Sequence, residues 1–164
     1  MKVGKFLLSW VFSFLVFTFV AVNTGFTATP LSDERVKEAK TVCGVQEVDV
    51  EGAKKLIAEG AVILDVREYT EYKAGHIPEA IWTPRGLLDF KVYEWLPDKE
   101  KTYLVYCATG GRGVVATCDL KKLGYKKVYN LKGGIAAWKE AKQPIETGEP
   151  EGPGKGMKKA THKH

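Results

Sequence analysis

The sequence predicts a three-layer α/β fold, in which helices flank a central, mostly parallel sheet of five strands. Short runs rich in β-branched and aromatic residues alternate along the chain with stretches of helical spacing. Glycine or proline separates many of these segments. The chain has 164 residues, of which 45% are hydrophobic and 27% charged, so it can bury one core. We therefore expect one domain with further segments at its two ends.

The first 29 residues have the pattern of an export segment. Lys2 and Lys5 precede an apolar run over residues 6–22. This run is intermediate in length between a signal-peptide core and a full membrane span, so a cleaved signal peptide and an uncleaved membrane anchor both remain open. We expect an exported protein that is periplasmic, or anchored in the inner membrane and facing the periplasm. Residues 30–44 are expected to form an N-terminal helical extension.

The expected domain spans residues 45–146. Strands are predicted at 45–48, 61–66, 80–82, 102–106 and 127–131, and helices at 52–59, 69–73, 87–95, 114–123 and 134–141. Asp49 is a possible helix cap, and the run 61–66 is the most strand-like, so we expect it to be the central strand. Beyond residue 146 the composition shifts to Gly, Pro, Glu and Lys, which predicts a disordered basic tail over 147–164.

The stretch from Cys107 to Arg112 reads Cys-Ala-Thr-Gly-Gly-Arg and joins a predicted strand to a predicted helix. Free N–H groups and the dipole at a helix N-terminus stabilise an anion. Glycines let the loop backbone curl so that its N–H groups point inward, and Arg112 adds a cation. We expect these features to lower the pKa of the Cys107 thiol below about 8.5 and to make it a nucleophile. The alternative is that Cys107 is a small buried apolar residue.

Two charged residues, Asp65 and Arg67, lie at the end of the expected central strand. Ligands of open parallel sheets bind at the carboxyl ends of the strands, where Cys107 is also expected.

The other cysteines give no sign of a metal site. Three cysteines and three histidines show no metal-ligand spacing, so we expect neither a metal nor zinc in particular. The odd number leaves at least one free thiol, assigned to Cys107. Cys43 is expected to be structural or exposed, and Cys118 to lie near the buried face of a helix and be inert. The net charge of +5 comes partly from the chain ends, so we expect no nucleic-acid partner.

Four motifs, in this order, resemble those of a single-domain rhodanese over roughly residues 45–145. They are Leu64-Asp65-Val66-Arg67-Glu68, Gly75-His76-Ile77-Pro78-Glu79-Ala80, the Cys107 to Arg112 loop, and Leu131-Lys132-Gly133-Gly134-Ile135-Ala136-Ala137-Trp138. The resemblance implies a rhodanese-like fold and a sulfurtransferase. In such an enzyme Cys107 takes a sulfane sulfur from a donor such as thiosulfate, becomes a persulfide, and passes the sulfur to cyanide or a thiol.

The resemblance also implies roles for individual residues. Cys107 matches the catalytic cysteine. Asp65 and Arg67 match a strand-end pair, interpreted as an ion pair or a set of hydrogen bonds that braces the loop. The substrate-binding residues are implied to be Ala108, Thr109, Gly110, Gly111, Arg112 and Gly113, whose backbone N–H groups would cradle the persulfide.

No cofactor is implied. The expected partners are a small sulfur donor and an acceptor, which is a thiol, cyanide or a sulfur-accepting protein. Membrane contact is expected only through an uncleaved N-terminal segment. An alternative is a sulfur carrier or partner-binding module without turnover. Phosphatases that share the fold need five residues between cysteine and arginine, whereas four separate Cys107 from Arg112, so no phosphatase activity is predicted.

Overall fold

The structure is a computed structural model that describes residues 30–150. Its sheet has five strands in the order β1-β5-β4-β2-β3, and every pairing between them is parallel. The strands are β1 (Gln46–Val48), β2 (Val62–Asp65), β3 (Ile81–Trp82), β4 (Thr102–Tyr106) and β5 (Lys127–Leu131). The predicted α/β class is therefore confirmed. The predicted export segment 1–29 and residues 151–164 of the predicted tail lie outside the described residues.

The prediction that residues 61–66 form the central strand is wrong, because β4 occupies the middle of the sheet. Both strands are apolar and are covered on both faces, so hydrophobicity does not distinguish them. Only the pairing of β4 with β2 on one side and β5 on the other reveals the order.

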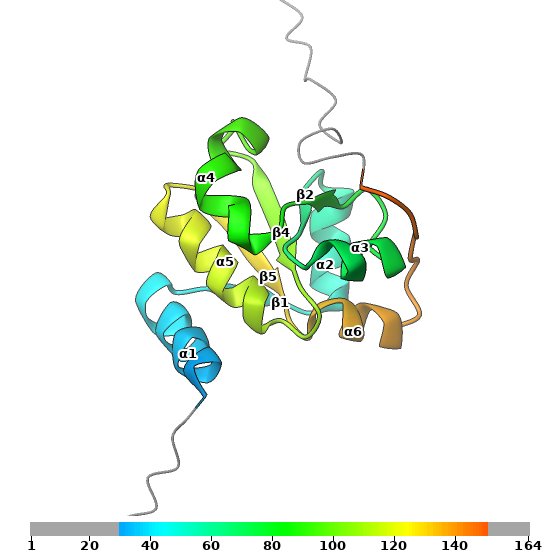
Figure 1. The fold of residues 1–164 in the computed structure, drawn as a ribbon, viewed down its shortest axis with the longest axis horizontal. Helices are drawn as coiled ribbons and strands as arrows, with labels where there is room; N and C mark the ends of the chain where they lie inside the picture. The colour runs from blue at the N-terminus through cyan, green and yellow to red at the C-terminus, as the bar shows by residue number, and fades with distance from the viewer. Residues whose placement is uncertain (1–29, 151–164) are drawn as a thin grey trace, which may run out of the picture.

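Helices cover both faces of the sheet (Figure 1). They are α1 (Leu31–Cys43), α2 (Val50–Ala58), α3 (Tyr69–Ala74), α4 (Arg85–Trp95), α5 (Gly111–Lys122) and α6 (Gly134–Glu140). Residues of α4 and α5 pack on one face, and residues of α2, α3 and α6 on the other. Asp49 caps α2 as predicted, accepting a hydrogen bond from the Gly52 N–H at 2.8 Å. No helix within residues 30–150 is long and apolar enough to cross a membrane.

Alternation along β4 decides which way the residue after it points. Tyr103 and Val105 belong to the core under α4 and α5, whereas Leu104 and Tyr106 belong to the core under α2 and α6. Cys107 continues this alternation and packs in the core under α4 and α5. The strand thus delivers the cysteine side chain to the layer that contains α5.

The N-terminal helix α1 lies on the outer side of α5 (Figure 1). Ala39 packs there against Val114 and Cys118. Cys43, the last residue of α1, forms a disulfide with Cys118, and their Cα atoms are 5.3 Å apart. Of the two roles considered for Cys43, the structural one holds, and Cys118 lies on the buried face as predicted. Cys107 is the free cysteine.

Residues 146–149 run back along α3. Glu146 exchanges two backbone hydrogen bonds with His76, of 2.8 and 2.9 Å, and the Gly148 N–H donates to the Lys73 carbonyl at 3.2 Å. The Glu149 carboxylate pairs with Lys73 and accepts a hydrogen bond from the Tyr69 hydroxyl. The first residues of the predicted tail are therefore held against the domain.

Candidate active site

Cys107 directly follows β4 at the carboxyl end of the sheet, and its loop leads into α5. The backbone N–H of Gly110 donates a hydrogen bond to the Cys107 sulfur at 3.2 Å. Gly110 has a φ of +103°, which residues with a side chain rarely adopt, and it precedes the first residue of α5. The helix therefore begins at Gly111, three residues earlier than predicted, so Arg112 is part of its first turn.

The N-terminus of α6 holds the back of this loop. The N–H of Ile135 donates to the Cys107 carbonyl at 2.8 Å, and the N–H of Ala136 donates to the Ala108 carbonyl at 3.1 Å. The C=O and N–H of one trans peptide group point in opposite directions. The Ala108 N–H shares its peptide group with the Cys107 carbonyl, and the Thr109 N–H with the Ala108 carbonyl, so both N–H groups point away from α6. A Cβ atom on Gly134 would lie 2.3 Å from the Cys107 oxygen, which explains the glycine in the fourth motif.

Gly113 has a packing role that the sequence did not reveal. It lies in the first turn of α5, where a Cβ atom would be 2.1 Å from Oδ1 of Asn130. Asn130 is fully buried, and its Nδ2 donates to Glu47 at 3.1 Å. A lone asparagine in a strand carries no signal that it will lie beneath this loop, and the prediction omitted it. Gly113 thus allows α5 to approach β5 closely.

Asp65 and Arg67 form the predicted ion pair, and it is buried. The Arg67 guanidinium donates to both carboxylate oxygens, with distances of 2.9, 3.1 and 2.6 Å, and also to the Gly75 carbonyl at 2.7 Å. Burial alone would lower the pKa of Arg67, but the hydrogen bond and charge of Asp65 outweigh burial and raise it. Each buried group therefore has the other as its hydrogen-bonded partner.

This pair is linked to the Cys107 loop through Tyr106. The Tyr106 hydroxyl donates to Asp65 at 2.7 Å and accepts from the Ile77 N–H at 3.1 Å. Burial, reinforced by the neighbouring Asp65 charge, raises the pKa of Tyr106 well above its ordinary value, so the hydroxyl keeps its proton. Two hydrogen bonds therefore hold the side chain of Tyr106, the residue immediately before Cys107.

Arg112 is paired with Glu71 of α3. Its Nη1 and Nη2 each donate to one oxygen of the Glu71 carboxylate, at 2.7 Å in both cases. Chiefly through this bond the pKa of Glu71 is lowered and that of Arg112 is raised. The prediction did not include Glu71 among the site residues, because nothing local indicates that two residues 41 positions apart will meet.

Within residues 30–150 no group of three or more His, Cys, Asp or Glu side chains could hold a metal ion.

The fold and this site define an α/β domain built around one free cysteine, held between the end of β4 and the N-terminus of α5. The model of the Rhodanese-like domain family matches residues 49–141. The chain belongs to this family.

Relatives differ in the activity that their names state. Thiosulfate sulfurtransferase 18 of Arabidopsis thaliana is 37% identical over 119 residues, covering 65% of this chain and 88% of that protein. The putative sulfur carrier protein YrkF of Bacillus subtilis is 32% identical over 102 residues, covering 61% of this chain and 54% of that protein. A Rhodopseudomonas palustris protein described as a possible tyrosine phosphatase superposes with a TM-score of 0.62 at 28% identity, covering 73% of this chain and 97% of that one.

Proposed function

We propose that this protein is a sulfurtransferase that moves a sulfane sulfur from a donor such as thiosulfate to cyanide or a thiol through a persulfide on Cys107. The observation that carries the proposal is the 3.2 Å hydrogen bond from the Gly110 N–H to the Cys107 sulfur, at the N-terminus of α5. A helix N-terminus and a converging N–H stabilise negative charge on that sulfur. A terminal persulfide sulfur carries the same kind of charge.

The reaction has two displacement steps. The Cys107 thiolate attacks the outer sulfur of thiosulfate, the S–S bond of the donor breaks, and sulfite leaves with the bonding electrons. An acceptor thiolate or cyanide then attacks the terminal sulfur of the persulfide, and the Cys107 thiolate leaves. Neither step requires a general base when the cysteine is ionised.

The rest of the site keeps the loop in shape for both steps. The α6 N–H groups hold two loop carbonyls, and the Asp65–Arg67 pair fixes Tyr106. These contacts do not touch the sulfur, so they act by positioning it.

Persulfide formation and thiocyanate production test the proposal together. Mass spectrometry after mixing with thiosulfate should find one added sulfur atom, which cyanide removes as thiocyanate. Cys107→Ser should abolish both signals. A matched variant that lacks the other two cysteines, Cys43→Ala with Cys118→Ala, should retain them. Thiocyanate formation by Cys107→Ser at the wild-type rate would refute the mechanism.

A sulfur carrier without efficient turnover is the second candidate, and the similarity to a putative sulfur carrier supports it. Stoichiometric persulfide on Cys107, combined with negligible turnover for small donors and acceptors, would favour the carrier over the enzyme.

Phosphatase activity is disfavoured despite the likeness to a possible tyrosine phosphatase. Four residues separate Cys107 from Arg112, which makes a ring of N–H groups smaller than a phosphate needs. Asp119, a conceivable proton donor to a leaving alcohol, is paired with Arg85 at 3.4 Å. Turnover of an aryl phosphate that Cys107→Ser abolishes would contradict this assignment.

We also propose that the protein acts outside the cytoplasm. The apolar run 6–22 supports export, and a disulfide between Cys43 and Cys118 suits an oxidising compartment. Cell fractionation of the full chain, with sequencing of its mature N-terminus, would test both the location and the cleavage of the segment. Recovery of the protein in the cytosolic fraction, with Cys43 and Cys118 reduced, would overturn the proposed location.

A further inference from the structure

The arginine of the catalytic loop is engaged before any substrate arrives. Both terminal nitrogens of Arg112 donate to the Glu71 carboxylate at 2.7 Å, in the bidentate arrangement that suits a guanidinium best. The side chains are 39% and 32% exposed, so the pair lies at the surface of the site rather than beneath it. Because the carboxylate and the guanidinium are both charged, the net charge of the pair is zero.

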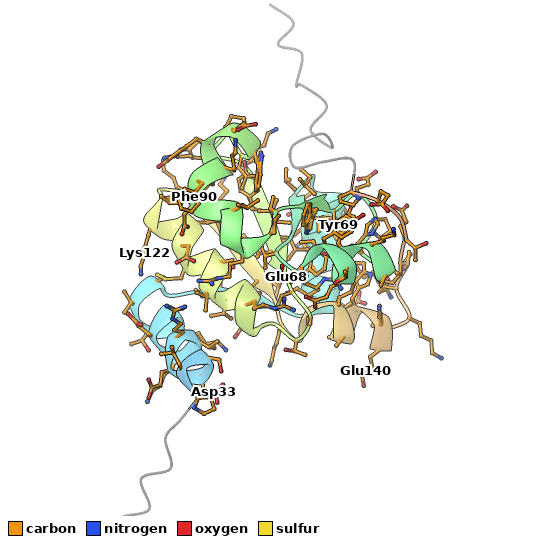
Figure 2. All side chains as sticks on the ribbon, viewed as in Figure 1. Asp33, Glu68, Tyr69, Phe90, Lys122 and Glu140 are labelled. Atoms are coloured by element: carbon orange, nitrogen blue, oxygen red, sulfur yellow. A yellow bond between two sulfur atoms is a disulfide. The ribbon has the colours of Figure 1, made fainter. Side chains whose placement is uncertain are left out.

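Glu71 is held in this position by its own helix. The backbone N–H of Glu68 donates to the Glu71 carboxylate at 3.2 Å, and the Glu68 side chain caps the N–H of Glu71 in return. Glu68 lies between α3 and the first turn of α5 in Figure 2, and its negative charge contributes to the raised pKa of Arg112. Two carboxylates thus accompany one guanidinium.

A second arginine of the site, Arg67, is not available to a substrate. Arg67 is buried and bound to Asp65 and to the Gly75 carbonyl. The remaining loop residues, Ala108 and Thr109, carry no charge. The two arginines, Arg112 and Arg67, therefore bring no uncompensated positive charge to a donor that approaches Cys107.

We infer that Glu71 determines donor specificity, disfavouring dianionic donors such as thiosulfate and favouring organic persulfides, R–S–SH. This inference rests on the proposed sulfur transfer at Cys107. A dianion is repelled by Glu71 and must compete with it for Arg112, whereas an organic persulfide carries at most one negative charge on the transferable group. In the favoured reaction the Cys107 thiolate attacks the terminal sulfur of R–S–SH, the S–S bond breaks, and R–S⁻ leaves. The terminal sulfur keeps its proton in the Cys107 persulfide, so charge and atoms balance.

The decisive variant is Glu71→Gln, which removes the charge while its side-chain oxygen can still accept the Glu68 N–H. We expect its kcat/KM for thiosulfate to rise about fivefold, the effect of one unit charge on a dianion across about 8 Å of water, mainly through a lower KM. Its kcat/KM for a small alkyl persulfide should rise by no more than about 2.5-fold, because a donor with at most one negative charge feels at most half of this repulsion. Raising the ionic strength should increase the wild-type rate with thiosulfate and affect Glu71→Gln less.

Two control variants distinguish the effect of the Glu71 charge from that of its structural contacts. Glu71→Asp keeps the charge but shortens the side chain, and it should not gain activity with thiosulfate. Glu59→Gln removes one negative charge from an exposed position at the end of α2 and should leave both donors unaffected.

The outcomes distinguish this inference from the proposed function. A gain by Glu71→Gln that is larger with thiosulfate than with the alkyl persulfide supports it. Equal changes with both donors, a loss with thiosulfate, or an equal gain by Glu71→Asp would overturn it and leave sulfur transfer intact. Absence of the Cys107 persulfide with either donor in every variant would instead refute the proposed function, and this inference with it.

Discussion

Removing the disulfide between Cys43 and Cys118 should destabilise the whole domain. The perturbation is the double variant Cys43→Ala with Cys118→Ala, compared with the oxidised wild-type protein. Alanine is preferable to serine, because Cys118 is buried and a hydroxyl would need a partner. The Cα separation of 5.3 Å lies within the usual range for disulfides, so the cross-link fits the fold that surrounds it.

The magnitude follows from the length of chain that the disulfide closes. The two cysteines are 75 positions apart, and the loop-entropy relation for a loop of that length gives about 4.5 kcal/mol at room temperature. Since domains of this kind are stable by about 5–15 kcal/mol, the loss is a large share of the total. A constrained unfolded chain also exposes less surface, so the m-value should be larger in the variant than in the wild type.

Urea titration followed by tryptophan fluorescence measures this difference. Trp95 and Trp138 are buried in the two different cores, so coincident transitions would show that both unfold together. A dithiol reductant should lower the unfolding free energy of the wild type and leave the variant unchanged. A difference below about 1 kcal/mol between oxidised wild type and variant would refute the argument that this cross-link constrains the unfolded state.

Three further predictions concern the site. Asp65→Asn should cost about 3–5 kcal/mol of unfolding free energy in urea titration, because it leaves the buried Arg67 guanidinium without its counter-charge; an effect below about 1 kcal/mol would mean that the pair is not buried as described. Gly134→Ala should lower both stability and sulfur transfer, since the new Cβ would lie 2.3 Å from the Cys107 oxygen, whereas Gly86→Ala, with open space around it, should be nearly neutral; similar behaviour of the two variants would contradict the packing. The lowered pKa of Glu71 means that its pair with Arg112 contributes full stability above the ordinary value of 4.5 and loses it as the pH falls through the lower folded-state value. The stability difference between wild type and Glu71→Gln should therefore shrink as the pH falls from about 6 to about 3, and a constant difference would show that the charge is not involved.

Local patterns in the sequence predicted most of the secondary structure. The strands at 102–106 and 127–131 have the predicted bounds, because each is a β-branched and aromatic run with a polar boundary. The predicted start of α5 was three residues too late, because the glycines that follow Cys107 were all assigned to a loop. In the structure only Gly110 takes a positive φ, and the helix begins at the next residue, Gly111.

Contacts between distant segments could not be predicted from the sequence. The loop motif singled out Cys107, but three cysteines permit three pairings, and only the packing of α1 on α5 selects Cys43 with Cys118. The partner of Arg112 is likewise on another helix, and the position of Asn130 depends on how closely α5 approaches β5. The order of the strands could not be predicted for the same reason, because two buried apolar strands have similar sequences and only their pairing distinguishes them.

The segment that follows α6 changes where this domain should be considered to end. The family match stops at residue 141, yet residues 146–149 bond to His76 and to Lys73 on α3. The same helix carries Glu71, which holds Arg112 of the Cys107 loop. Trimming the chain at the family boundary would therefore remove an outer support of the helix that carries Glu71. A shortened protein could fold and still report a donor preference that differs from that of the full chain, so kinetic work on this protein should retain its residues through Pro150.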